Sequence, residues 1–409
     1  MSATEPPGAM PSPGFLDSRA AARTGAFVAL LTLFLLWFWA SVVWTILATS
    51  DALVLNVDFR VFWGAARLAV MGDALAALDP VRLAEIHDDT RNPWLPWVYP
   101  PGLLLAIYPL GLVDYLTAWL AFIGVSLAAI LGAVRLLAGS LRPVWLAFAL
   151  SPAILPALVL GQVSVLWAAG LVAALACLRD GRVVAAGILL GLLTFKPQLG
   201  PLVALALVAS GRWRVVAVAA ATAVAFHGAA TLVFGAAYWP AFLDLAGQHA
   251  ERLRSDVADA ELMVSPYSAL TAIGLPEPAA FALQWTLSAA AAAAVWRAWS
   301  MRGLGFDARA AVLVCAIPLA SPYLWYAETA LLAPALMFLM RAGLVRVTLP
   351  GVILAALMAA GTTPYLMARL LVEGGDLPMR LFAAPVLLAA FLVAVSPLIR
   401  HLGTRTSRP

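Results

Sequence analysis

Long apolar segments recur along almost the whole chain, and short connections that often carry arginine separate them. The segments lie at about 24–47, 115–137, 143–160, 162–178, 183–195, 198–210, 215–236, 277–296, 309–322, 325–341, 347–366 and 379–399. A helix needs about 20 apolar residues to cross the roughly 30 Å of bilayer hydrocarbon. Hydrophobic residues make up 64% of the 409 residues and charged ones 11%, which is too apolar for a soluble core of this size. We therefore predict an all-α polytopic membrane protein with about 12 transmembrane helices, within a range of 10–13.

Two further apolar stretches, 101–112 and 263–274, are too short to cross the hydrocarbon. We expect them to form juxtamembrane or re-entrant helices on the outer side. Counting them as spans would reverse the sidedness of the arginine-bearing connections around them.

Alternate connections concentrate the positive charge of the chain. Sixteen of its 25 basic residues, but four of its 21 acidic ones, lie near 1–23, 135–142, 179–182, 212–214, 297–309, 341–346 and 400–408. By the positive-inside rule these connections and both termini face the cytoplasm, in the inner (plasma) membrane of the cell. The arginines therefore follow topology, and the basic pI does not indicate nucleic acid as a partner.

The same pattern predicts the domain organisation. Residues 1–22 form a disordered cytoplasmic tail, 23–400 a single integral-membrane domain, and 401–409 a second cytoplasmic tail. The first apolar run is too long for a cleaved signal peptide, so we interpret it as a retained signal anchor. The long connections, about 48–114 and 237–277, lie outside.

Short cytoplasmic connections limit the chemistry. None is long enough for a nucleotide-binding domain of the usual hundred or so residues. An active site would therefore face the extracytoplasmic side, where an activated substrate has to arrive attached to a lipid.

Lys196 is the only lysine of the chain, and it lies between two nearly apolar half-length segments. Pro197 follows it and suits the first position of a descending helix, whose amide groups attract anions. We interpret Lys196 as lining a polar cavity that holds a phosphate. The alternative is a lysine that snorkels near a helix end.

Polar residues mark the outer connections. The apolar period from Phe59 onward predicts a helix in the interface plane, with Arg60 on its polar face and Asp58 at its start. Asp58 suits both a helix N-cap and a carboxylate general base. Tyr99, before two prolines, suits either a headgroup-level anchor or a substrate platform.

Short outer turns contribute further polar groups. Gln162 follows Gly161, Tyr323 follows Ser321-Pro322, and Glu328 is a second charge within apolar sequence that can partner Lys196. His227 fits a hydrogen-bonded packing residue. No cluster has metal-ligand spacing, so we expect no metal and no cofactor.

Asp58-Phe59, Tyr99-Pro100-Pro101, Gly161-Gln162, Lys196-Pro197-Gln198 and Ser321-Pro322, in this order, resemble glycosyltransferase family 87. The resemblance covers about 48–331 and implies the C-type glycosyltransferase architecture, with polyprenyl-phosphate-mannose as a donor outside the membrane. It implies that Asp58 is the catalytic base. Many relatives have histidine or another polar residue after Ser-Pro, where this chain has Tyr323.

The predicted function is transfer of a hexose, with mannose favoured, from a polyprenyl-phosphate sugar to a hydroxyl of a glycolipid or polysaccharide. A single carboxylate base favours inversion. The substrate-binding candidates are Arg60, Tyr99, Gln162, Lys196, Gln198, Tyr323 and Glu328. Alternatives are a transporter or flippase for a lipid-linked anion and another C-type enzyme, such as an oligosaccharide ligase. The long outer loops, and the clustering of the polar residues on one side of the membrane midplane, argue against the transporter hypothesis.

Overall fold

The computed structural model describes residues 58–87, 95–255, 262–346, 348–366 and 379–406, together with parts of 26–41. Regular structure in these ranges is helical, with one isolated antiparallel bridge between Met263 and Trp325. The predicted all-α class is therefore confirmed. The predicted N-terminal tail and much of the first predicted span lie outside the described residues.

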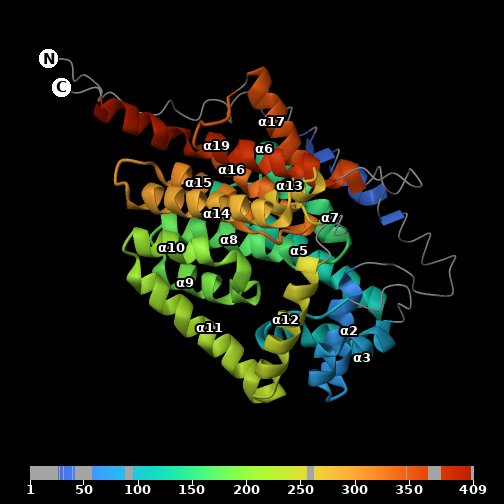
Figure 1. Ribbon diagram of the computed structural model, residues 1–409. Helices are drawn as coiled ribbons and strands as arrows, with labels where there is room; N and C mark the ends of the chain where they lie inside the picture. Colours follow the sequence, from blue (N-terminus) through green and yellow to red (C-terminus); the bar gives the residue numbers. More distant parts are fainter. Residues whose placement is uncertain are drawn as a thin grey trace.

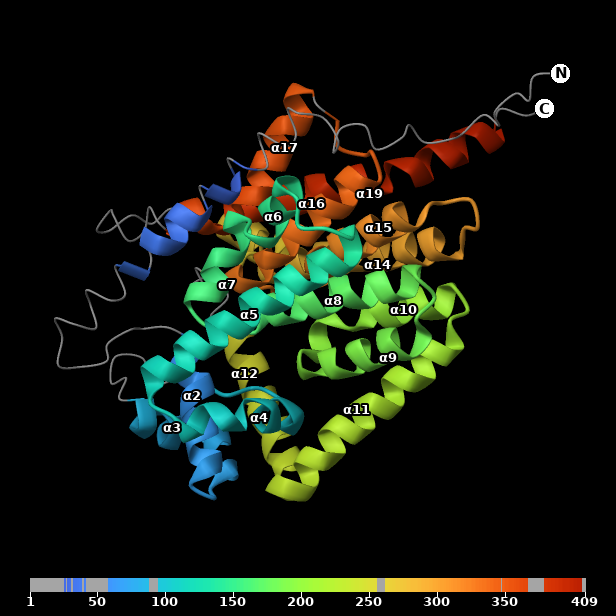
Figure 2. The same cartoon turned by 180° about the vertical axis from the view of Figure 1, so that it is seen from behind.

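A group of short helices follows the first predicted span. It comprises α2 (Phe59–Val70), η1 (Ala74–Leu78), α3 (Pro80–His87), α4 (Pro101–Ile107) and η2 (Tyr108–Leu112). Figures 1 and 2 show α2, α3 and α4 gathered beside one end of the long helices. The predicted helix from Phe59 and the predicted short helix after Tyr99 are both confirmed. Pro100 is extended and Pro101 opens α4, the position that proline favours.

Eleven further helices make up most of the remaining fold in the described residues. They are α5 (Tyr115–Ala138), α8 (Ser164–Arg179), α9 (Val183–Leu192), α10 (Pro201–Ala209), α11 (Trp213–Phe234), α12 (Tyr238–Ser255), α14 (Glu277–Ser300), α15 (Phe306–Ala320), α16 (Leu332–Arg341), α17 (Leu349–Ala360) and α19 (Met379–Thr406). α5 packs on α8, α8 on α9, and α14 on α15, which also contacts α16 and α19 (Figures 1 and 2). The short α13 (Pro266–Ala272) lies where a short outer helix was predicted.

Four helices among the described residues are long and apolar enough to cross a membrane: α5, α11, α14 and the 379–399 part of α19. Several predicted spans are shorter or interrupted. The segment 143–160 is divided into α6 (Pro143–Ala149), η3 (Pro152–Ile154) and α7 (Leu155–Val159), because proline lacks the N–H that continues a helix. The total of about 12 spans remains a prediction.

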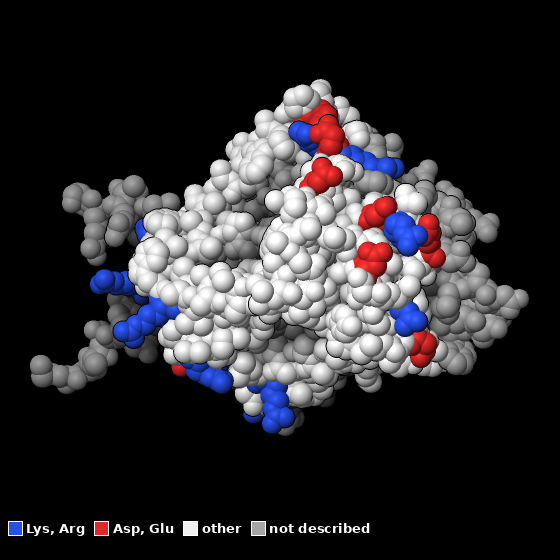
Figure 3. All heavy atoms as spheres, turned by 90° about the horizontal axis from the view of Figure 1, so that it is seen from below, with Lys and Arg blue, Asp and Glu red and all other residues white. Residues whose placement is uncertain are grey.

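The surface supports membrane insertion. In Figure 3, Lys and Arg predominate at the left and lower left, Asp and Glu lie mainly at the top and right together with further Lys and Arg, and a broad surface without charged residues lies between them. Large apolar side chains are exposed on two of the helices long enough to span a membrane, among them Trp213, Val224 and Leu232 of α11 and Trp285 of α14. Apolar side chains exposed on helices of spanning length are what contact with bilayer hydrocarbon requires.

A glycine turn joins the short-helix group to the long helices. Gly161, at φ +76°, ends α7 with a Schellman pair, in which Gln162 N–H donates to Ala157 O (2.7 Å) and Gly161 N–H to Leu158 O (3.3 Å). Phe59 N–H donates to Leu160 O at 2.9 Å. A Cβ added at Gly161 would lie 2.3 Å from the Cβ of Phe59. Glycine is therefore required here both by conformation and by space.

We predict that Gly161→Ala lowers the free energy of unfolding by roughly 2–4 kcal/mol, because it combines left-handed backbone strain with a clash against the Phe59 side chain. Thermal unfolding in detergent measures the effect. Gly139→Ala is the matched control, since Gly139 has φ +74° but open space around it, and should cost roughly 1–2 kcal/mol. Equal losses for the two variants would contradict the role of the Phe59 contact.

Candidate functional site

The carboxylate of Asp58 binds side chains from distant parts of the sequence rather than the backbone of α2, the helix that it precedes. Its Oδ2 accepts hydrogen bonds from Gln162 Nε2 at 2.7 Å and from the Tyr326 hydroxyl at 2.5 Å. It makes no side-chain cap bond to α2. Asp58 thus stands at the predicted N-cap position of α2, but its carboxylate binds two side chains from distant segments instead of capping the helix.

Lys196 forms a buried ion pair directly beside this group. Its Nζ lies 2.5 Å from Glu328 Oε1 and donates to Ser164 Oγ at 2.8 Å. Lys196 is 3% exposed and Glu328 6%, so the alternative of a snorkelling lysine is wrong. The second carboxylate oxygen, Glu328 Oε2, accepts from the backbone N–H of Trp325 at 3.0 Å. Glu328 is thus the predicted partner that balances the buried ammonium.

Two short segments each contact both Asp58 and Lys196. In the turn before α8, Gln162 binds Asp58, and Ser164, two residues later, binds Lys196 and Glu328. In η6 (Tyr326–Leu331), Tyr326 binds Asp58, and Glu328, two residues later, pairs with Lys196. The carboxylate of Asp58 and the ammonium of Lys196 are consequently positioned by the same pair of segments.

The local backbone explains how these side chains reach one point. α9 ends in η4 (Leu193–Phe195), and Lys196 stands between η4 and η5 (Pro197–Leu199). The predicted descending helix starts only at Pro201, after η5, rather than at Pro197. This break in helical structure places Lys196 away from the ends of both α9 and α10.

The environment raises the affinity of the Asp58 carboxyl for its proton. Burial raises the pKa of Asp58, whereas the hydrogen bonds from Tyr326 and Gln162 and the charge of Lys196 lower it. Asp58 and Gln162 are half-buried, while Lys196, Ser164 and Glu328 are buried. A partly accessible carboxylate therefore lies beside an enclosed positive charge, an arrangement suited to proton abstraction.

Tyr99 borders the cluster. Burial raises the pKa of its hydroxyl to about 12, and the charges of Lys196, Glu328 and Asp58 all act on it. Its ring packs against Phe62 and Trp97, with centroids 5.3 and 4.8 Å away. The hydroxyl therefore remains neutral, as a hydrogen-bonding group at the edge of the site.

Three other residues were predicted to bind substrate: Arg60, Gln198 and Tyr323. Arg60 is buried, so its predicted place on a polar helix face is wrong; its charge acts on Tyr115 at the start of α5. Gln198 is exposed and makes no side-chain hydrogen bond among the described residues. Tyr323 packs edge-on against Tyr267, 6.1 Å between centroids, in a separate aromatic cluster. Among the described residues, Gln198 and Tyr323 make no hydrogen bond to Asp58.

Sequence reasoning overlooked two residues of the cluster, Tyr326 and Ser164. Both lie two positions from a recognised candidate, Glu328 and Gln162 respectively, in segments that are otherwise apolar. A polar residue in an otherwise apolar segment could have indicated that Tyr326 and Ser164 belong to the site. The partner of such a residue could not be predicted, because it depends on contacts between segments far apart in the sequence.

His227 fulfils its predicted packing role. Its Nδ1 accepts from Gly102 N–H at 3.3 Å, and its Nε2 lies 3.0 Å from Thr194 Oγ1. Thr194 in turn donates to Gly191 O at 2.6 Å. A neutral ring with the proton on Nε2 satisfies all three bonds. His227 thus ties α4 and α11 to the turn that carries Lys196.

No group of three or more metal-ligand side chains occurs among the described residues. The fold and the cluster define an all-helical membrane protein with a carboxylate and a paired ammonium in one polar site. The chain belongs to glycosyltransferase family 87, whose family model matches residues 97–322, more than half of the sequence. The match includes Tyr99, Gln162 and Lys196 but neither Asp58 nor Glu328. No curated protein and no solved structure matches the chain.

We predict that Lys196→Met and Glu328→Met each destabilise the protein by roughly 3–5 kcal/mol, because each leaves one buried charge unpaired. The double variant should recover a large part of this loss, since it removes both charges. Thermal unfolding of the three variants measures the coupling. Arg82→Ala is the control, because the Arg82–Glu85 pair is exposed and should contribute less than about 1 kcal/mol. Additive losses in the double variant would contradict an energetically coupled pair.

Proposed function

We propose that this family 87 glycosyltransferase moves a hexose, with mannose favoured, from a polyprenyl-phosphate sugar to a hydroxyl of a glycolipid or polysaccharide. The reaction takes place on the extracytoplasmic side of the plasma membrane, with both termini in the cytoplasm. The observation that carries the proposal is the half-buried Asp58 carboxylate held by Gln162 and Tyr326 beside the Lys196–Glu328 pair.

In the proposed reaction, Asp58 removes the proton of the acceptor hydroxyl as its oxygen attacks the anomeric carbon. A new carbon–oxygen bond forms there, and the bond from that carbon to the phosphate oxygen breaks. Polyprenyl phosphate leaves with the electron pair of that bond. A single carboxylate acting as base, without a second nucleophilic carboxylate, favours one displacement and inversion at the anomeric carbon.

Lys196 can stabilise the negative charge of the leaving phosphate. Two of its three ammonium hydrogens go to Ser164 and Glu328, which leaves one for an anionic ligand. A donor that is already oriented when charge develops lowers the barrier more than one that has to reorganise. Tyr99 and Gln162 lie at the accessible edge, where they can position substrate hydroxyls.

Arg60, Gln198 and Tyr323 are proposed to take part in substrate binding as well. Exposed Gln198 follows directly on the Lys196 turn, and Tyr323 lies near the outer segment of α13. Buried Arg60 adds positive charge under the start of α2. A transporter would use the same buried charges, but it gives no reason to hold a carboxylate with two side-chain donors.

We expect Asp58→Asn to lower sugar transfer by a factor of roughly 10²–10⁴, the usual contribution of a positioned general base. The asparagine carbonyl can still accept from Gln162 and Tyr326, so the fold should survive. The assay uses purified protein, radiolabelled polyprenyl-phosphate-mannose and extracted membrane lipids. Asp73→Asn, an exposed aspartate of the same predicted outer loop, is the matched control.

Undiminished transfer by Asp58→Asn would remove this residue as the base. The anomeric configuration of the product tests the displacement separately, since retention would exclude a single inverting step. If the wild type transfers no mannose, the same assay with other polyprenyl-phosphate hexoses decides between another sugar and another function.

We expect transfer to decrease as the pH falls through the pKa of Asp58, because the base must be ionised. Burial raises that pKa above the ordinary aspartate value, so the acid limb should lie above it. The Tyr326 hydrogen bond lowers the pKa, and Tyr326→Phe should therefore move the acid limb to higher pH. A kcat/KM–pH profile measures both effects. A limb that stays in place or moves to lower pH in Tyr326→Phe would contradict the assignment.

A further inference from the structure

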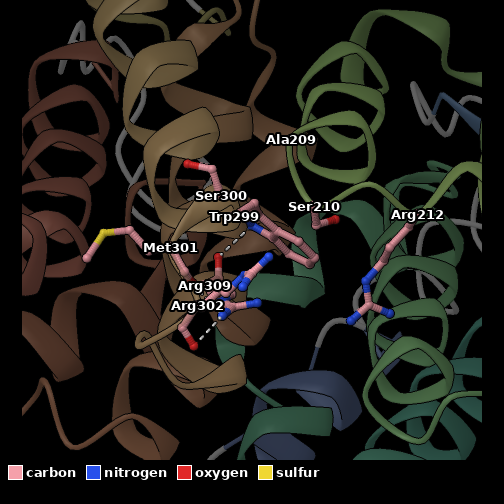
Figure 4. Close-up of a pocket in the computed structure, with 8 residues that line it drawn as sticks. All are labelled: Ala209, Ser210, Arg212, Trp299, Ser300, Met301, Arg302 and Arg309. Carbon is pink, nitrogen blue, oxygen red and sulfur yellow. Dashed lines mark hydrogen bonds between the residues drawn. The ribbon is translucent and has the colours of Figure 1, made fainter.

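A polar pocket of about 290 Å³ is lined by residues of the α10–α11 and α14–α15 connections. Figure 1 shows these connections at the left of the view, away from α2 and α3 at the lower right. Two connections form it: α10 to α11 supplies Ala209, Ser210 and Arg212, and α14 to α15 supplies Trp299, Ser300, Met301, Arg302 and Arg309. Figure 4 shows Arg302 and Arg309 together on one side of the pocket and Arg212 on the other. Three guanidinium groups thus surround one hollow.

No carboxylate balances these charges within the pocket lining. The nearby Asp307 accepts instead from Arg341 Nε at 3.0 Å. Burial lowers the pKa of the Arg212 guanidinium, and the positive charge of Arg309 lowers it further. Like charges brought together in a partly enclosed space repel each other, and a bound anion would relieve that repulsion.

Backbone carbonyls use only part of the hydrogen-bonding capacity of these arginines. Arg212 Nη1 donates to Leu178 O at 3.0 Å, and Arg309 Nη2 donates to Met301 O at 2.5 Å. The buried Nε of Arg309 has no hydrogen-bond partner among the described residues. Each guanidinium carries five N–H donors, so several remain for a ligand.

Topology alone accounts for arginines on this side of the protein, but not for this arrangement. The positive-inside rule is satisfied by exposed residues such as Arg346. It does not require arginines from two connections to converge on one pocket, beside the indole of Trp299 (Figure 4). Planar guanidinium groups match phosphate oxygens in pairs, which makes a phosphate group the fitting anion.

We propose that this pocket binds the phosphate group of an anionic ligand on the predicted cytoplasmic side, separately from the Asp58 site. An acidic phospholipid headgroup and a soluble phosphate compound offer the same chemistry. The pocket lies where α10 and α14 end, the level at which arginines meet headgroups. The proposal does not depend on the transferase chemistry.

The test uses the full chain purified in detergent. Native mass spectrometry measures binding of phosphatidylglycerol against phosphatidylcholine, and calorimetric titration measures binding of inorganic phosphate and pyrophosphate. Arg302→Gln is the probing variant, because Arg302 is exposed and makes no side-chain hydrogen bond to the described residues. Arg346→Gln removes the same charge from the same predicted face, outside the pocket.

We expect Arg302→Gln to weaken binding about tenfold, the loss of one charge-assisted contact, and Arg346→Gln to leave it nearly unchanged. Arg302-dependent binding of phosphatidylglycerol alone identifies a lipid headgroup as the ligand. Arg302-dependent binding of phosphate or pyrophosphate alone identifies a soluble ligand. Absence of selective binding to any of these probes, or equal weakening by the two variants, would overturn the proposal.

Discussion

The ion pair between Lys196 and Glu328 is the interaction around which the site is organised. A charge removed from water is costly unless it is paired and hydrogen-bonded. Here the ammonium has Glu328 and Ser164, and the carboxylate has Ser164 and the Trp325 N–H as well. Satisfying one buried lysine therefore requires the turn after α9, the start of α8 and η6 to meet at a single point.

The same convergence positions Asp58. Gln162 lies two residues before Ser164, and Tyr326 two residues before Glu328, so the segments that satisfy Lys196 also bind the aspartate. Gly161 permits this, because its missing side chain leaves room for Phe59 directly behind the carboxylate. The base and the cation of the proposed reaction are thus held in a fixed relation by packing that serves stability as well.

Charge is distributed over the two ends of the molecule in different ways. At the Asp58 end, the buried positive charge is balanced by a carboxylate within hydrogen-bonding distance. At the other end, three arginines share a pocket without an acidic residue in its lining. In the first arrangement the buried charges are already paired before a substrate binds. In the second, the unbalanced positive charge can be neutralised by the proposed anionic ligand.

The sequence by itself determined the helical class, the helix from Phe59, the short helix after Tyr99, the break at Lys196 and the family. These follow from apolar periodicity, proline positions and short motifs, all of which act over a few residues. Tertiary structure alone decided that Asp58 binds Tyr326, 268 positions away, that Arg60 is buried and that Tyr323 packs elsewhere. Local patterns specify where a helix begins and which face is apolar. Which distant side chains meet is decided by how all the helices pack, because each buried polar group must find its partner there.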